Sequence, residues 1–230
     1  MRKIVLFVVL LVFGSVTFAQ VSKTISLTTA GSLSVELSSE ELNTITDLTV
    51  TGNIDARDFK TMRDEMPVLA IIDLSGVNVA EYYGVEGTDG TENTKYFENE
   101  IPNNALKSKA SLSIFKFPES VTSIGYFAFS NCSALKHITI PNKVETVKMY
   151  SFEGCSSTNT INIPPSLLSI EPYAFNWTSG EVIVDTNNPN YSSLDGVLFN
   201  KDHTSLIQFP TSKLGTYIMP NTINHISIRA

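Results

Sequence analysis

The stretch LKHITIPNKVETV (residues 135–147), followed by SFEGC (151–155), holds one complete copy of the pattern that decides the fold. Its first half ends in alternating polar and apolar residues, which predicts a strand with one buried face. Pro141 cannot donate a hydrogen bond to a strand ladder, so it marks the strand end and a turn toward a second short segment, residues 144–147. Each repeat is therefore predicted to form one coil of chain.

The same pattern returns every 23 residues in the second half of the chain. The matching columns are Pro118, Pro141 and Pro164; Leu106, Phe129, Phe152 and Phe175; Ile124, Val147 and Ile170; and Ala105, Ala128, Ser151 and Ala174. One coil cannot bury its apolar side chains by itself, whereas stacking on an equivalent neighbour removes them from water. Each fully buried side chain contributes roughly 1.5 to 3 kcal/mol. Residues 101–230 are therefore predicted to form a solenoid of stacked coils.

The regular pattern changes after Phe175. We expect Val182 and Val184 to point inward, a turn at residues 187–190 and a short strand at residues 197–199. Residues 207–210 and 217–220 are predicted to be two further strands, each ending in proline. Ile223 and Ile226 would then occupy the second strand of the last coil. Aligned in this way, the chain ends at Ala230, one residue before the core Phe of that coil, so we expect a truncated array that belongs to a longer protein.

Residues 20–100 have another rhythm, which predicts an N-terminal cap region. Two similar segments, residues 48–52 and 72–76, are predicted strands. Between them, Asp55 is a predicted cap of a helix that carries Phe59, Met62 and Met66 on one face and ends at Pro67. This strand-helix-strand unit spans residues 45–76, and we expect its helix to cover the N-terminal end of the stack. A short helical turn is expected at residues 39–42.

Residues 81–100 are rich in Gly, Thr, Asn and acidic residues and are predicted to be a solvated loop at the edge of one coil. A calcium site built from Glu86, Asp89 and Glu92 is a second interpretation, but their spacing matches no dedicated calcium loop. We favour the solvated loop.

The first 19 residues read as an export signal. Arg2 and Lys3 precede an apolar run, residues 4–13, that is too short to span a bilayer, and small side chains before residue 20 predict cleavage after Ala19. No later stretch is apolar enough to hold the mature chain in a membrane. A secreted or extracellular location follows as an expectation.

Charge and cysteine content exclude two classes of protein. The formal net charge is -7, with 16 basic residues and 23 acidic ones, so the chain lacks the basic surface that nucleic acid requires. Two cysteines are too few for a disulfide scaffold. Cys132 and Cys155 are 23 residues apart and fall in adjacent coils, where either a disulfide or two buried free thiols would fit.

The repeated residues resemble those of the BspA-like leucine-rich repeats of bacterial secreted and cell-surface proteins. The resemblance rests on residues 135–141 with 151–155, on residues 123–132, and on an irregular repeat at residues 188–199. Residues 55–76 look like the segment that precedes the repeats in members from gut bacteria. The resemblance implies a right-handed, curved α/β solenoid, exported or attached to the bacterial cell surface, and adhesion to host matrix proteins or other cells. It does not identify a ligand.

No pattern in the sequence predicts catalysis, a cofactor or a metal site. His137, His203 and His225 fall in different coils and lack metal-ligand spacing. Neither a glycine-rich phosphate loop nor a G-x-S-x-G motif is present. We therefore expect a protein that is not an enzyme.

The candidate binding residues point outward from the first strand of each coil. Stacked, they would form a continuous patch on the concave face, where solenoids commonly receive partners. The residues are Ile114, Lys116, His137, Thr139, Thr160, Asn162, Ile183, Gln208 and Ile218. Ordinary solvation of a sheet explains the same pattern equally well. We expect a protein-binding or cell-adhesion module, and the alternative is a structural spacer or scaffold within a longer surface protein.

Overall fold

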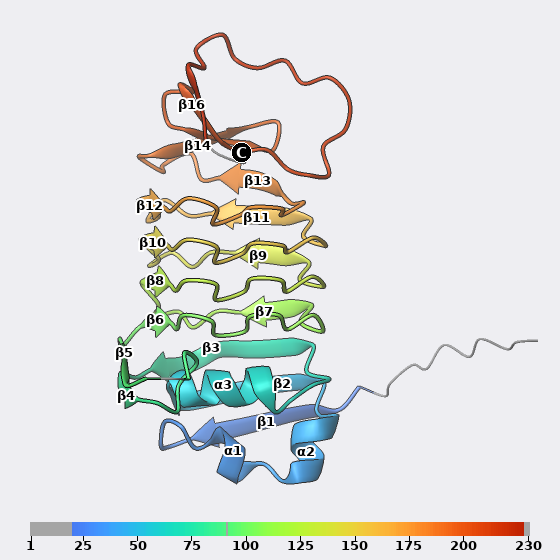
Figure 1. Cartoon of the computed structure of the whole chain (residues 1–230), viewed down its shortest axis with the longest axis vertical. Helices are drawn as coiled ribbons and strands as arrows, with labels where there is room; N and C mark the ends of the chain where they lie inside the picture. The colour runs from blue at the N-terminus through green and yellow to red at the C-terminus, as the bar shows by residue number, and fades with distance from the viewer. Residues whose placement is uncertain (1–19, 91, 228–230) are drawn as a thin grey trace, which may run out of the picture.

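The computed structural model describes residues 20–90 and 92–227. The predicted export signal, residues 1–19, lies outside them. Figure 1 shows coils lying one above another along the long axis, with helices gathered at the N-terminal end and an irregular lobe at the C-terminal end. This arrangement confirms the solenoid predicted from the 23-residue repeat.

Parallel strands on one side of each coil form the longer of the two stacked surfaces. Its first sheet joins β1 (Ser22–Leu27), β2 (Asp47–Ile54), β3 (Ile71–Val79) and β7 (Ile114–Lys116). Its second sheet joins β9 (His137–Thr139), β11 (Thr160–Ile163) and β13 (Glu181–Val184). A backbone hydrogen bond of 3.1 Å from Lys136 N to Ser113 O links the coils at the junction of the two sheets.

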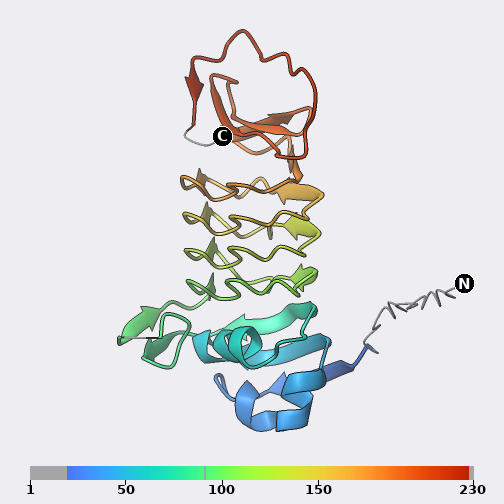
Figure 2. The same ribbon diagram turned by 45° about the vertical axis from the view of Figure 1, so that its right-hand side comes forward.

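The second strands of the coils form a separate parallel sheet along another side of the stack (Figures 1 and 2). It consists of β6 (Glu100–Ile101), β8 (Ser123–Ile124), β10 (Thr146–Val147) and β12 (Ser169–Ile170). Ile101, Ile124 and Val147 are fully buried. The prediction of two short strands for each coil is confirmed.

The aromatic column predicted from the sequence is present in the core. Leu106, Phe129, Phe152 and Phe175 are all buried. The ring centroids of Phe129 and Phe152 are 5.1 Å apart, and those of Phe152 and Phe175 are 5.5 Å apart, with the planes within 7° of parallel. Each coil contributes one ring to this column, so the spacing of the rings matches the spacing of the coils.

A second stack of rings lies at the turns that close the coils. Phe127, Tyr150 and Tyr173 have centroids 4.9 and 5.1 Å apart, and each residue has a positive φ between 55° and 65°. A left-handed backbone costs an ordinary residue roughly 1–2 kcal/mol. Stacking of the three rings offsets part of that cost, so these residues serve the turn as well as the packing.

Both cysteines are buried free thiols. The Cys132 Sγ donates to Leu106 O at 3.1 Å, and the Cys155 Sγ donates to Phe129 O at 3.3 Å. Each thiol thus reaches back to a carbonyl of the preceding coil. Of the two alternatives left open by the sequence, the structure shows the free thiols.

The N-terminal cap contains more structure than the sequence predicts. The predicted helix is α3 (Ala56–Asp64), capped by Asp55 as expected, and Phe59, Met62 and Met66 are fully buried. The expectation that this helix covers the end of the stack is wrong, because α3 packs within the coil between β2 and β3 (Figure 1). The end is covered by β1, α1 (Leu33–Glu36) and α2 (Ser39–Thr44). Of these three, only the helical turn near α2 is predicted.

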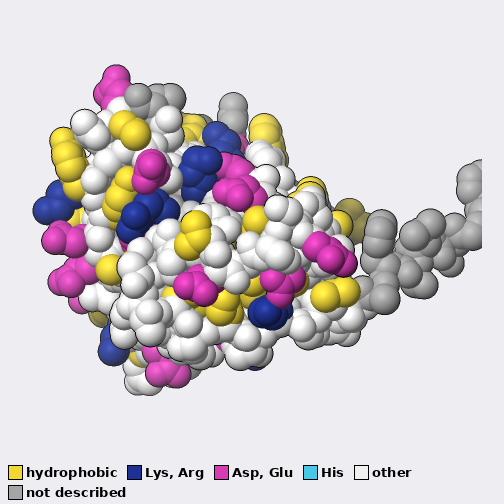
Figure 3. Space-filling model, turned by 90° about the horizontal axis from the view of Figure 1, so that it is seen from below, with side chains coloured by type: hydrophobic (Ala, Val, Ile, Leu, Met, Phe, Trp, Pro, Cys, Tyr) yellow, Lys and Arg dark blue, Asp and Glu magenta, His cyan; other side chains and the backbone are white. Residues whose placement is uncertain are grey.

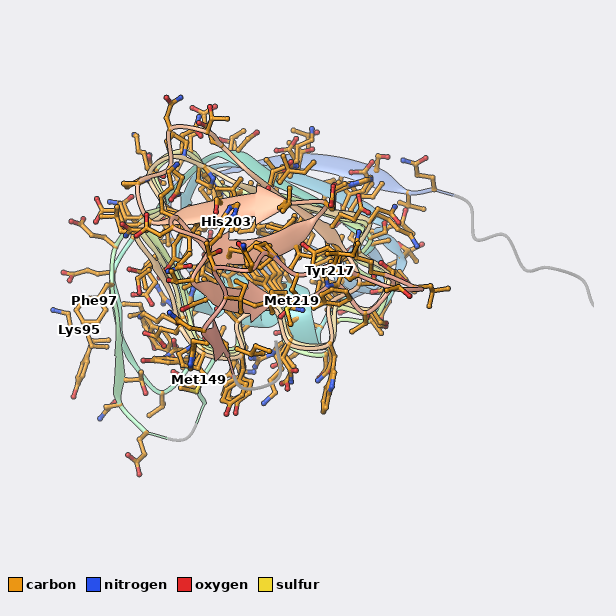
Figure 4. All side chains as sticks on the ribbon, turned by 90° about the horizontal axis from the view of Figure 1, so that it is seen from above. Lys95, Phe97, Met149, His203, Tyr217 and Met219 are labelled. Carbon is orange, nitrogen blue, oxygen red and sulfur yellow. The ribbon has the colours of Figure 1, made fainter. Side chains whose placement is uncertain are left out.

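The segment predicted as a loop contains two paired strands. Strands β4 (Tyr82–Gly84) and β5 (Thr94–Tyr96) pair in antiparallel fashion. The loop prediction fails because Tyr82 and Tyr96 pair across the strands, with ring centroids 5.9 Å apart. Lys95 and Phe97 project from the outer edge of this hairpin (Figure 4). Its acidic residue Asp89 accepts a hydrogen bond of 2.5 Å from Asn104 Nδ2.

The C-terminal lobe departs from the predicted coils. Strands β14 (Tyr191–Leu194), β15 (Val197–Asn200) and β16 (Ser205–Gln208) pair in antiparallel fashion, and β17 (His225–Ile226) adds to β16. The strand expected at residues 217–220 is absent from the described chain. Ile226 is 54% exposed instead of buried, because its strand pairs with β16 and not with β12.

Candidate ligand-binding face

The outward side chains of β1, β2, β3, β7, β9, β11 and β13 form one surface, here called the long sheet face. The register of the parallel strands aligns its residues in rows that run from coil to coil. One row is Ser22, Asp47, Ile71, Ile114, His137, Thr160 and Glu181; the next is Thr24, Thr49, Asp73, Lys116, Thr139, Asn162 and Ile183. Each row continues through most of the stack.

Seven of the nine predicted face residues lie on this surface. Ile114 and Ile183 are 44% and 53% exposed, although both are large and apolar. Lys116, His137 and Thr139 are exposed as well, whereas Thr160 and Asn162 are half-buried. The placement of these residues is as predicted, and their role in binding stays a prediction.

Two of the nine predicted residues lie elsewhere, and their assignment to the face is wrong. Gln208 belongs to β16 in the C-terminal lobe and is buried, with its side-chain amide donating to Phe209 O at 3.2 Å. Ile218 is 87% exposed but belongs to no strand. The antiparallel turn at Asp195 and Gly196, both with positive φ, takes the chain out of the regular coil before these residues.

The face also includes residues that the sequence analysis did not assign to it. Asp47, Thr49, Ile71 and Asp73 extend both rows into the N-terminal coils, and Glu181 ends the first row. The alternation of residues 48–52 and 72–76 was the signal that could have found them. That alternation predicts the outward side chains of these strands as well as the strands themselves.

Polar side chains on the face bind one another across coils. Lys116 Nζ lies 2.7 Å from Asp73 Oδ2, His137 Nδ1 lies 2.9 Å from Thr160 Oγ1, and Asn162 Nδ2 donates to Thr139 Oγ1 at 3.3 Å. These contacts order the side chains before any partner arrives. An ordered surface loses less conformational entropy on binding.

The Lys116–Asp73 pair is the charged centre of the face. Burial acts to raise the pKa of Asp73, but hydrogen bonds from Lys116 and Ser75 outweigh it, so this pKa is lowered. The hydrogen bond to Asp73 raises the pKa of Lys116. Both groups are therefore ionised at neutral pH.

A hollow of about 410 Å³ opens on the face beside this pair. Ile114, Phe117 and Pro141 supply apolar walls, and Lys116 and His137 supply polar ones. Its volume falls within the range of small-ligand pockets. The hollow can receive one apolar side chain of a partner while the polar groups at its rim orient the partner.

The described part of the chain lacks a cluster of side chains typical of metal binding. No group of three or more His, Cys, Asp or Glu side chains among these residues could hold a metal ion. His203 lies against Phe199 in the C-terminal lobe, with ring centroids 5.2 Å apart, far in sequence from His137 on the face. Within residues 20–90 and 92–227, no helix has the length and apolar composition needed to cross a membrane.

Stacked coils with an aromatic core column and a parallel sheet on one side define a leucine-rich repeat solenoid. The chain belongs to the family described as the BspA type leucine rich repeat region, whose model matches six copies over residues 99–226. No curated protein sequence matches the chain.

Solved structures with a similar fold include that of the pneumococcal vaccine antigen PcpA, with a TM-score of 0.53, 22% identity, and coverage of 80% of this chain and 41% of that one. A leucine-rich repeat protein from Eubacterium ventriosum ATCC 27560 matches with a TM-score of 0.45, 20% identity, and coverage of 82% and 45%. A leucine rich cell surface protein from Faecalibacterium prausnitzii A2-165 matches with a TM-score of 0.42, 18% identity, and coverage of 78% and 50%. The chain spans half or less of the length of these structures.

Proposed function

We propose that the chain is a secreted or surface-displayed binding module that holds a protein partner on the long sheet face. The observation that carries the proposal is the continuity of this face across the coils, with two large apolar side chains, Ile114 and Ile183, left exposed on it. Repeat solenoids use such extended surfaces to bind partners. The predicted export signal supports a location outside the cell.

The proposed contact combines an apolar centre with a polar rim. Ile114 and the adjoining hollow accept an apolar side chain, and Lys116, His137 and Asn162 accept or donate hydrogen bonds around it. This is the usual anatomy of a protein interface. The module binds without catalysing a reaction and without a cofactor, and its proposed partners are proteins of host matrix or cell surfaces.

The test uses the mature chain, residues 20–230, and a panel of immobilised fibronectin, laminin and collagen together with whole epithelial cells. Lys116, His137 and Asn162 are replaced together by Glu. Binding to the probe that the parent recognises should weaken at least about tenfold, because charge reversal and lost contacts at the centre of an interface carry most of its energy.

The matched control replaces Lys107, Thr122 and Ser169 together by Glu. These exposed residues lie off the long sheet face, and the change in formal charge is the same, -4, in both triple variants. The control should bind as the parent does. Equal binding by both triple variants would place the site elsewhere. No binding by the parent to any probe would favour a structural spacer.

A further inference from the structure

Building on the proposed function, on which this inference rests, we propose that the partner presents an extended peptide segment to the long sheet face. The segment carries two large apolar residues at alternate positions and a basic residue beyond them. A second hollow, of about 220 Å³, lies beside the first on this face and is lined from the coils of β9, β11 and β13. Thr139 lines both hollows, so they are neighbouring parts of one groove, here called the face groove.

The spacing of the two hollows matches that of alternate side chains in an extended peptide. The first hollow lies over β7 and β9, and the second lies over β9, β11 and β13. Because strands stack about 4.8 Å apart, the centres of the hollows are about 7 Å apart. An extended chain rises about 3.4 Å per residue, and every second side chain points to the same side. A segment that crosses the strands along the stack can therefore place residues i and i+2 in the two hollows.

Both hollows offer apolar walls to such residues. Ile114 and Phe117 line the first hollow, and Ile183 and Pro164 line the second. Ile114 and Ile183 are the two large apolar side chains that the regular coils leave exposed on this face. The first hollow is the larger, so it suits an aromatic residue, and the second suits an aliphatic one. Insertion of both removes exposed apolar surface from water.

Polar side chains between the hollows suit the backbone of the segment. The Asn162 Nδ2 donates to Thr139 Oγ1 at 3.3 Å. A side-chain amide has a second N–H and an acceptor oxygen. Within the described chain, neither of these groups of Asn162 has a partner. They can bind the backbone C=O and N–H of the residue that lies between the two apolar ones.

The face groove is acidic at its β13 end. Asp185 lines the second hollow and is exposed, and Glu181 in β13 is exposed as well. Neither carboxylate forms an ion pair with any residue that the structure describes. Lys201 reaches the same turn but donates to Thr186 O at 3.1 Å. A basic residue of the partner would therefore meet two carboxylates that lack a partner of opposite charge.

Other charged parts of the surface carry both signs side by side. At the other end of the face groove, Lys116 is paired with Asp73 at 2.7 Å. Seen from below, the N-terminal end of the molecule also shows Lys and Arg among Asp and Glu (Figure 3), and Lys23 pairs with Glu41 there at 2.6 Å. Complementary charge orients a partner on a surface. The basic residue of the segment therefore belongs at the β13 end, next to the aliphatic residue.

The test is fluorescence anisotropy of short labelled peptides with the mature chain at up to ~1 mM, a range that covers weak peptide complexes. The peptide GSFSLSKSG carries the proposed motif. GSFLSSKSG and GSFSSLKSG have the same composition, but their apolar residues are adjacent or three apart. GSFSLSESG replaces the lysine by glutamate. Each peptide is also made in reverse order, because the segment can run along the groove in either direction.

The motif peptide, in one of its two directions, should bind at least about tenfold more tightly than either spacing variant, because only one apolar side chain of those variants can enter a hollow. The glutamate peptide should bind about threefold more weakly, the size of an exposed charge contact. In the variant Glu181→Gln with Asp185→Asn, this preference for lysine should disappear.

A ring placed between the hollows should close the face groove. Thr139→Trp should weaken binding of the motif peptide at least about tenfold. The matched control is Thr122→Trp, since Thr122 is also exposed but lies beside β8, off the long sheet face. The control should bind as the parent does, and both variants should keep the circular dichroism spectrum of the parent.

Three results would overturn the inference: no binding by the motif peptide in either direction, equal binding by the spacing variants, or unchanged binding by Thr139→Trp. Equal binding of the lysine and glutamate peptides to the parent would remove the basic residue from the motif. The proposed function is tested separately by the panel of matrix proteins and cells. A parent that binds that panel through Lys116, His137 and Asn162 but binds no motif peptide would keep the proposed function and contradict this inference.

Discussion

At the residue scale, one core column is joined by hydrogen bonds as well as by apolar contact. Lys109, Cys132, Cys155 and Thr178 recur at the 23-residue spacing. The last three each donate to the carbonyl of the residue 26 positions earlier, with Thr178 Oγ1 lying 2.8 Å from Phe152 O. The cysteines are therefore polar links between coils that are small enough to fit the core.

Two substitutions at Cys155 separate its role as a hydrogen-bond donor from its role as a small core residue. Cys155→Thr keeps a donor in the geometry that Thr178 already uses, and Cys155→Val has a similar volume but no donor. The Thr variant should unfold with a free energy about 1 kcal/mol larger than the Val variant, the usual contribution of one hydrogen bond. Urea unfolding of both measures the difference. A more stable Val variant would make Cys155 a plain apolar core residue.

Alkylation tests the burial of both thiols. Burial raises the pKa of Cys132 to about 12 and raises that of Cys155 as well, so thiolate is scarce at neutral pH. Intact mass should show no iodoacetamide label on the native chain and two labels after denaturation without a reductant. Denatured chain that stays unlabelled would indicate a disulfide.

Lys109 makes the free energy of unfolding depend on pH. Its Nζ donates to Met66 O at 2.6 Å inside the junction between α3 and the regular coils, and burial lowers its pKa from 10.5 to about 8. Between pH 8 and pH 10.5, Lys109 is protonated to a greater extent in the unfolded chain than in the folded chain. Stability from this group should therefore rise with pH from about 8 to about 10.5.

Lys109→Met removes this dependence. Relative to the variant, the parent should gain on the order of 1 to 3 kcal/mol of unfolding free energy between pH 7.5 and pH 10. Urea unfolding at both pH values measures it, with the exposed Lys143→Met as control. A parent-to-variant difference that stays constant across the range would show that Lys109 titrates normally in the folded chain.

At the element scale, the N-terminal cap depends on one buried carboxylate. Asp58 in α3 accepts hydrogen bonds from the backbone N–H groups of Gly31, Leu33 and Asp55 at 2.6, 2.9 and 2.9 Å. Burial raises the pKa of Asp58. The carboxylate ties the loop before α1 to the helix, so α1 and α3 form one capping unit.

Asp58→Ala should lower the unfolding free energy by at least about 2 kcal/mol, because three N–H groups lose their acceptor. Hydrogen exchange should show faster exchange at Gly31 and Leu33, while amides of β9 and β11 exchange as before. Glu65→Ala, at the exposed end of the same helix, serves as control. Unchanged protection at Gly31 would mean that the cap is held by its apolar contacts alone.

The helices and strands were predictable to different degrees for physical reasons. A period of 23 residues and the alternation around Ile138 are local signals, so β9 and its equivalents could be predicted. Strand β1 alternates only through Ile25 and Leu27, and it lies outside the 23-residue repeat, so its signal is weaker. The hairpin of β4 and β5 depends on Tyr82 meeting Tyr96 across a polar segment, which composition alone does not reveal.

At the scale of the whole molecule, the predicted outward placement of the face residues is correct wherever the coils are regular, and their role in binding stays a prediction. Lys116, His137 and Asn162 follow the repeat and lie where stacking places them. Gln208 and Ile218 follow the strand-then-proline pattern as well, but the antiparallel pairing of β14 and β15 redirects the chain before them. The local pattern predicts the short strand at residues 197–199, but it does not show that β14, β15 and β16 pair with one another in antiparallel fashion.

The solenoid is held together by contacts between neighbouring coils, so its stability depends on each member of the aromatic column. Phe152 lies between Phe129 and Phe175 and is fully buried. Its loss leaves a cavity at the centre of the stack. Phe97 is 56% exposed on the hairpin and provides a control of the same chemistry.

Urea unfolding of Phe152→Ala beside Phe97→Ala tests the stacked column most directly. We expect a loss of about 3–5 kcal/mol for Phe152→Ala and a change within about 0.5 kcal/mol for Phe97→Ala. Equal unfolding free energies for the two variants would show that the aromatic column does not hold the stack together.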